Sequence, residues 1–147
     1  MEFDEIDTKI IKNLLVDARL SARQLGYKLG LSTATVLTRI KKLEQKKVIT
    51  GYMARLDHQT LGYDITAIIE IKTAKGKMLE IEGKIAESEN VCGVYDITGH
   101  YDISVICKFK SRAELSIFVK SLSTIPNVEN TETHIVLNTI KEDFRLL

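Results

Sequence analysis

The chain has 147 residues, of which 44% are hydrophobic and 28% charged, and its net charge at pH 7 is +1. This composition is that of an ordinary folded protein, and the length allows one domain or two small ones. No apolar run reaches the roughly 20 residues that a membrane-spanning helix needs, and the acidic start Met-Glu-Phe-Asp-Glu does not resemble a signal peptide. We therefore expect a cytoplasmic protein with no membrane partner.

The first two predicted helices begin at residues that can cap them. A helix is expected over residues 4–16, where Asp4 can accept hydrogen bonds from the first amides. A second begins at Ser21, since Ser21-Ala22-Arg23-Gln24 has the form of a capping box, and Gly30 ends it. Their apolar stripes are formed by Ile6, Ile10 and Leu14 in the first helix and by Leu25 and Leu29 in the second.

A third helix is predicted from the cap Ser32 to about Lys46, with Val36, Ile40 and Leu43 turned inward. The short Gly30-Leu31-Ser32 connection gives the helix pair the spacing of a helix-turn-helix. Such motifs read bases through the first residues of the second helix. The candidate DNA-binding residues are Arg23, Ser32, Thr33, Ala34, Thr35, Thr38, Arg39 and Lys42.

Positive charge is concentrated around this helix pair. Residues 18–47 hold eight basic residues and one acid, a local net charge of +7, which is a candidate phosphate footprint. The threonine hydroxyls and the Ala34 methyl suit base edges, while Arg39 or Lys42 can reach guanine or phosphate. Two alternatives stay open: the helix is a solvated amphipathic one, and Arg39, which borders the core stripe, pairs with a neighbouring acid.

The remaining elements follow a different period. A linking strand over 49–56 and a turn at 61–64 lead into the alternation of a strand, and a capping box at Ser111–Glu114 opens the last helix. Strands are predicted over 65–72, 91–98, 102–109 and about 128–140, and helices over about 76–88 and from Ser111. The order βαββαβ is that of a ferredoxin-like domain.

One face of this predicted sheet lacks a cover. The residues Ile103, Val105, Cys107 and Phe109 are expected to pack against the two helices, whereas Ile68, Val94, Ile106 and Val136 are expected on the opposite face. A half-apolar open face on a small domain indicates pairing with a second copy of the chain.

The segment Thr98-Gly99-His100-Tyr101-Asp102 connects two predicted strands. Glycine permits a positive φ and close approach to the backbone. One interpretation is a plain hairpin turn. The other is an effector-binding loop formed by Thr98, Gly99, His100, Tyr101 and Asp102, in which backbone amides hold a carboxylate and Asp102 pairs with an amine.

Catalytic and metal signatures are not found in the sequence. It contains no nucleophile elbow, phosphate-binding loop or dinucleotide fingerprint, so we expect no enzyme activity and no cofactor. The three histidines show no metal-ligand spacing. Cys92 and Cys107 are expected to be reduced, partly buried thiols.

Over nearly its whole length the chain resembles the leucine-responsive/asparagine-operon (Lrp/AsnC, feast/famine) transcription regulators. The similarity rests on five motifs: Asp4-x-x-Asp7-x-x-Ile10-Ile11, Asp17-Ala18-Arg19-x-Ser21, Gly30-Leu31-Ser32 with Val36-x-x-Arg39-Ile40-x-x-Leu43-Glu44, Val48-Ile49-x-Gly51-Tyr52-x-Ala54-x-Leu56-Asp57, and Thr98-Gly99-x-Tyr101-Asp102. The resemblance implies homodimers formed through the linker strand and the C-terminal sheets, assembly into octamers or similar discs, and an effector, often an amino acid, between dimers near residues 98–102.

Two positions depart from the family pattern. Lys47 stands where the family often has glycine, and because a left-handed cap is costly for other residues, we expect this helix end to differ. Gly26 stands where alanine is usual, which costs about 1 kcal/mol of helix propensity but keeps the position small.

The sequence thus predicts an α+β protein, with a helix-turn-helix (winged-helix-like) domain at 1–48, a linker strand at 49–62 and a ferredoxin-like βαββαβ domain for dimerisation and effector binding at 63–147. The predicted function is sequence-specific transcription regulation as a homodimer or larger oligomer, modulated by an amino acid or another small molecule. The expected partners are double-stranded DNA and further copies of the chain, with the transcription machinery as a further candidate. The alternative function is an architectural DNA organiser of low sequence specificity.

Overall fold

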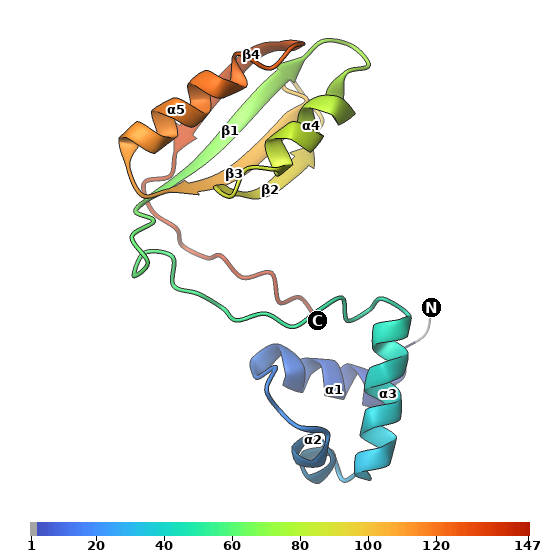
Figure 1. Ribbon diagram of the computed structural model, residues 1–147. Coiled ribbons are helices and arrows are strands. Elements are labelled where there is room, and N and C mark those ends of the chain that lie inside the picture. Colours follow the sequence, from blue (N-terminus) through green and yellow to red (C-terminus); the bar gives the residue numbers. More distant parts are fainter. Residues whose placement is uncertain (1–2) are drawn as a thin grey trace. The chain divides into compact units, whose positions relative to one another are not determined.

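The computed structural model describes residues 3–147, and its chain forms two compact units (Figure 1). The first contains the chain up to Arg55 together with Glu142–Leu147, and the second is Leu56–Lys141. The boundary therefore lies within the predicted linker at 49–62. The last six residues cluster with the first unit.

Three helices form the first unit: α1 (Glu5–Val16), α2 (Ala22–Leu29) and α3 (Thr33–Gln45). Their predicted caps are present, because each requires contacts only three residues apart. Asp4 accepts from the Asp7 amide, Ser21 and Gln24 form the complete capping box, and Ser32 accepts from the Thr35 amide. Of the residues predicted from the apolar stripes, five are buried, namely Ile10, Leu14, Leu25, Val36 and Leu43. The other three, Ile6, Leu29 and Ile40, are partly buried and pack against them.

The end of α3 differs from what we expected at Lys47. This residue adopts the left-handed conformation, with φ 55°, although it carries a Cβ. The Lys47 amide donates to the Glu44 carbonyl and the Val48 amide to the Leu43 carbonyl, both at 2.9 Å. These two bonds are those of a Schellman cap. The expectation of a different helix end was therefore wrong, and the chain keeps the cap without glycine.

The predicted strand at 49–56 is not present as a strand among the described residues. A strand needs a hydrogen-bonded neighbour, and within one chain this segment has none. Its large side chains Tyr52, Met53 and Leu56 are exposed. Following it, the predicted turn forms around Gly62, whose φ is 87°.

The second unit contains a four-stranded antiparallel sheet with strand order β2-β3-β1-β4. Two helices lie over one of its faces (Figure 1). This is the predicted ferredoxin-like arrangement. The elements are β1 (Ile65–Thr73), α4 (Met78–Ala86), β2 (Val91–Asp96), β3 (Ile103–Phe109), α5 (Arg112–Leu122) and β4 (Val128–Ile135).

The core between sheet and helices follows the predicted alternation, since Ile103, Val105, Cys107 and Phe109 are fully buried. Val94, however, packs against this core and does not lie on the open face. A register shift between Val91 and Gly93 explains the error, because one extra residue reverses the side to which the following residues point.

Two predicted details are wrong at the edges of the second unit. Strand β4 stops at Ile135 and not at about 140, because its partner β1 begins at Ile65 and little chain remains to pair with. At α5, Ser111 accepts from the Glu114 amide as expected, but the Glu114 carboxylate accepts from the Lys110 amide. The reciprocal bond is thus displaced by one residue.

Within the first unit, the C-terminal segment contacts the end of α1. The Arg145 guanidinium donates to the Leu15 carbonyl at 3.3 Å and is held by Asp143. Arg145 keeps the pKa of Asp143 well below its usual range. A cation at the C-terminal end of a helix interacts favourably with the helix dipole.

None of the helices in the described residues is long and apolar enough to cross a membrane.

Candidate nucleic-acid interface and effector loop

The outward face of α3 presents the residues that the sequence selected for DNA contact. Ser32, Thr33, Ala34, Thr35, Thr38 and Lys42 are exposed, as is Arg23 on α2. Ser32 and Thr35 share a hydrogen bond between their hydroxyls at 2.8 Å, in addition to the cap. Thr33, Ala34 and Thr38 have no such role in capping, so they form the part of this face best suited to contact base edges.

Arg39 lies in an ion pair inside the first unit. One of its nitrogens donates to Asp4 at 2.6 Å and to Asp7 at 2.7 Å, and the Arg39 side chain is only 26% exposed. The hydrogen bonds that Arg39 donates to Asp7 and Asp4 raise the pKa of Arg39. The structure therefore shows the alternative in which Arg39 pairs with acids on α1, and these contacts do not support its assignment as a DNA-binding residue.

The other seven basic residues of segment 18–47 remain at the surface. Arg23, Lys28, Lys41, Lys42, Lys46 and Lys47 are exposed, and Arg19 is exposed although it donates to Asp17. With Arg39 neutralised by Asp4 and Asp7, the positive charge available to a polyanion comes from these seven side chains. Such a surface supplies the sequence-independent part of DNA affinity.

Asp102 fastens the 98–102 loop to strand β1. Its Oδ1 accepts from Lys72 Nζ at 2.9 Å, and its Oδ2 accepts from the Thr73 amide at 2.8 Å. The Thr73 amide and Lys72 lower the pKa of Asp102. Both carboxylate oxygens already have partners, so the contacts do not support Asp102 as the partner of a ligand ammonium group.

Of the other loop residues, Tyr101 is hydrogen-bonded to β4, whereas Thr98, Gly99 and His100 are exposed. Tyr101 donates from its hydroxyl to Glu132 on β4 at 2.6 Å, and its ring meets that of His100 edge to face. Thr98, Gly99 and His100 are exposed, and Gly99 has a φ of 124°. Gly99 thus adopts a positive φ of the kind that glycine permits, and its backbone is exposed.

Two groups of titratable side chains were missed by the sequence analysis. On the open face, Glu70, Glu132 and His134 bring their ligand atoms within 4.8 Å of one another. The only sequence signal was the alternation Glu-x-His within one strand. The partner Glu70 comes from β1, which only the strand register reveals.

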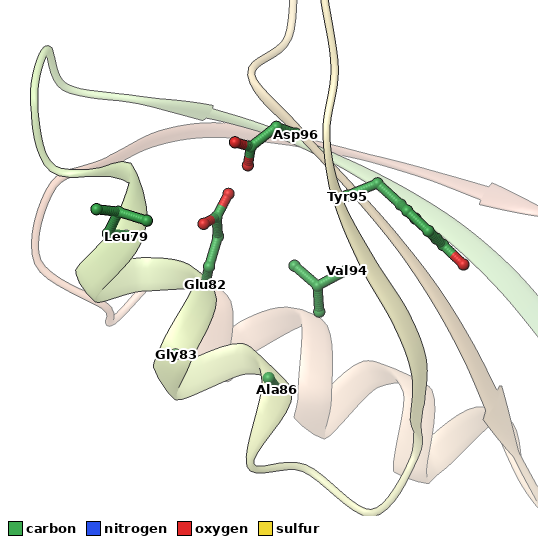
Figure 2. A pocket seen from close by; sticks show the side chains of 7 residues that line it. All are labelled: Leu79, Glu82, Gly83, Ala86, Val94, Tyr95 and Asp96. Atoms are coloured by element: carbon green, nitrogen blue, oxygen red, sulfur yellow. The ribbon is translucent and has the colours of Figure 1, made fainter. Parts of the chain in front are cut away.

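The second missed group lies between α4 and β2, in a hollow of about 550 Å³. Glu82 and Asp96 point toward each other there, beside Leu79 and Val94 (Figure 2). Glu82 Oε1 is buried without a hydrogen-bond partner in the described chain, since two carboxylates can bond only when one is protonated. The contact with Asp96 accordingly raises the pKa of Glu82 to about 7.

Comparisons with known proteins agree with both units. The AsnC-type helix-turn-helix domain matches residues 3–44, and the Lrp/AsnC ligand binding domain matches residues 66–146. The chain belongs to the Lrp/AsnC family. It is a transcriptional regulator of this type, and the family consists of regulators rather than enzymes.

The relatives of this Lrp/AsnC protein match it from end to end. An HTH-type transcriptional regulator of Pyrococcus furiosus is 49% identical over 99% of both chains, and the regulator FL11 of Pyrococcus abyssi is 38% identical over 99% of this chain and 97% of its own. The structure of Escherichia coli AsnC superposes with a TM-score of 0.90 at 28% identity, covering 99% of this chain and all of that one. A regulator of Neisseria meningitidis, solved as a complex with L-methionine, gives 0.91 at 25% identity, covering 99% and 97%.

Proposed function

We propose that this Lrp/AsnC regulator binds specific DNA sites through α3, as a homodimer or larger assembly, and that a small molecule such as an amino acid modulates it. The observation that carries the proposal is the exposure of Thr33, Ala34 and Thr38 on α3, in a segment whose seven basic residues that are unpaired or weakly paired within the described chain are also exposed. Hydroxyl and methyl groups distinguish bases, whereas lysines supply affinity without sequence preference. The presence of base-reading hydroxyl and methyl groups, in addition to lysines, favours a sequence-specific regulator over an architectural DNA organiser.

Two substitutions on α3 separate base reading from phosphate contact. Thr38→Ala should change the preference among operator variants by about 1 kcal/mol or more at particular bases. Lys42→Ala should weaken binding to all sequences alike and reduce the salt slope by roughly one unit. Binding isotherms over a range of salt concentrations and operator variants measure both effects.

A matched control is Lys84→Ala, which removes one exposed lysine from α4 in the other unit and should leave the salt slope unchanged. Footprinting in the presence of competitor DNA then tests specificity. Discrete protected sites support a regulator, while uniform protection along the DNA supports the architectural alternative. If Thr38→Ala leaves the base preference unchanged, the proposed orientation of α3 is wrong.

The open face of the sheet is proposed as the surface that pairs two chains. Without Val94, the apolar side chains on this face are Ile68, Ile106 and Val136, and Tyr95 lies over Gly93 beside them. A lysine introduced at Ile68 would bring a charge into the interface, which is costly without a partner. Light scattering should show a smaller assembly for Ile68→Lys but not for Leu79→Lys, an exposed site on α4. A stable wild-type monomer at micromolar concentration would rule out this interface.

The exposed amides of the 98–102 loop are proposed to hold the carboxylate of the effector. The L-methionine complex of the Neisseria relative supports an α-amino acid as the ligand class. Gly99→Ala should weaken binding, because alanine is strained at a φ of 124° and its Cβ intrudes on the approach to the backbone. Calorimetry with the twenty amino acids tests this.

The control for this experiment is Gly83→Ala on α4, where an added Cβ meets no atom within 4 Å. It should leave ligand binding unchanged. The unfolding midpoint of both variants must be measured, so that loss of binding is not confused with loss of the fold. Failure of the wild type to bind any amino acid at millimolar concentration would contradict this part of the proposal.

A further inference from the structure

Three potential metal ligands converge on the open face of the sheet, outside the helix-turn-helix and beside the 98–102 loop. Glu70 on β1 stands directly opposite Glu132 on β4 in the strand register. His134 stands two residues further along β4 and therefore points to the same face. In the single chain the side chains of Glu70, Glu132 and His134 are 32%, 52% and 49% exposed.

The spacing of the ligand atoms fits a single ion. Nε2 of His134 lies 3.4 Å from Oε2 of Glu70 and 4.0 Å from Oε1 of Glu132. Two ligand atoms that are each about 2.1 Å from a tetrahedral ion lie about 3.4 Å apart. The first distance already has this value, and a small rotation of the Glu132 carboxylate would bring the second close to it.

Glu132 is also oriented as a metal ligand would be. Its Oε2 accepts a hydrogen bond from the Tyr101 hydroxyl at 2.6 Å, while its other oxygen, Oε1, is the one near His134. Bonds of this kind fix the orientation of ligating carboxylates in known metal sites. Tyr101 therefore turns one oxygen of Glu132 toward the place where the ion would lie.

The charge of the group calls for a cation. Glu70 and Glu132 stand directly opposite each other on neighbouring strands. Two like charges in this arrangement destabilise a sheet. Lys72, which lies on the same face, is bonded to Asp102. A neutral imidazole with two carboxylates offers one nitrogen and two oxygens at a net charge of −2, which suits a divalent ion of the first transition row.

We propose that Glu70, Glu132 and His134 bind a divalent transition-metal ion such as Zn²⁺. Three protein ligands leave at least one coordination position open. Because Tyr101 belongs to the 98–102 loop and holds Glu132, binding of the ion would stiffen the link between this loop and β4. The site does not depend on the proposed effector, and it can be tested with metal alone.

The test is calorimetric titration of the EDTA-treated full-length protein with ZnCl₂, repeated with CoCl₂. We expect one binding event at the group, abolished by His134→Ala and strongly weakened by Glu132→Gln. Tyr101→Phe should weaken binding by about 10-fold, as expected for loss of a bond that orients a ligand. Zn²⁺ should also raise the unfolding temperature of the wild type but not of His134→Ala.

Two controls address other metal-binding side chains. His58→Ala removes a histidine outside the group, and Cys92→Ser removes the exposed thiol; both variants should bind Zn²⁺ as the wild type does. Light scattering of each variant shows whether its assembly is unchanged, and Glu132→Gln provides a nearly isosteric variant if His134→Ala alters it. The proposal is overturned if the wild type binds neither metal at 100-fold molar excess, or if binding survives both His134→Ala and Glu132→Gln.

Discussion

The left-handed residue at the end of α3 gives a sharp test of how this chain forms its helix cap. Lys47 has a φ of 55°, and the cap that it completes joins α3 to Val48 and Ile49, which pack against the helical core. The left-handed conformation costs a residue with a Cβ roughly 1–2 kcal/mol. Lys47→Gly removes this cost while keeping both backbone hydrogen bonds of the cap.

Part of the stability gained by Lys47→Gly is lost again through the unfolded state, because glycine has more conformations to lose on folding. This entropic cost is about 0.4–1 kcal/mol. Since Lys47 is exposed, little packing is lost with its side chain. The net effect should be a stabilisation of the first unit by about 0.5–1 kcal/mol. A urea titration followed by far-ultraviolet circular dichroism should show the transition of this unit at higher urea.

The neighbouring lysine is a matched control. Lys46 carries the same charge and is also exposed, but its φ is −80°, a conformation that any residue adopts without strain. Lys46→Gly should therefore destabilise the unit by up to about 1 kcal/mol, since only the unfolded-state term acts. Opposite signs at adjacent lysines are the expected result. If Lys47→Gly destabilises the protein as much as Lys46→Gly does, the left-handed cap is not strained and the reasoning fails.

Three further outcomes follow from buried or paired groups. Asp7→Asn should destabilise the first unit by about 1–3 kcal/mol in denaturant titration, because Asp7 is buried and pairs with Arg39. Ile69→Val should cost the second unit about 0.5–1.5 kcal/mol in the same assay. Asp96 raises the pKa of Glu82 to about 7, so the stability contributed by protonated Glu82 is complete below pH 4.5 and lost as the pH rises to 7. Glu82→Gln should remove this part of the pH dependence, and an unchanged profile would contradict the shared proton.

The features that the sequence predicted correctly depend on contacts between near neighbours. The capping box at Ser21 needs only Gln24, and the cap at Ser32 needs only Thr35. The alternation in β3 is likewise local, because each buried residue is two positions from the next. Such patterns are visible in the sequence because their geometry is fixed by one helix turn or one strand repeat.

The features that were missed depend on residues far apart in the chain. Asp102 is bonded to Lys72, thirty positions away, so its role in holding the loop could not be distinguished from a role in ligand binding. Val94 was assigned to the wrong face because a single bulge reverses the alternation. Arg39 had two partners available by sequence, DNA or an acid, and only the packing of α1 against α3 decides for the acids.

The 98–102 loop is held at one end while its middle remains exposed, and this bears on how a ligand would bind. Asp102 holds the loop to β1 and Tyr101 holds it to β4, whereas in the described part of the chain Thr98, Gly99 and His100 are exposed and make no such hydrogen bond to a strand. A site whose framework is already ordered loses less entropy on binding than one that must fold around its ligand. Of these two anchors, Tyr101 links the loop to a β4 carboxylate, that of Glu132. If a ligand at the loop changes the affinity for an ion held by Glu132, the ion must change the affinity for that ligand by the same factor.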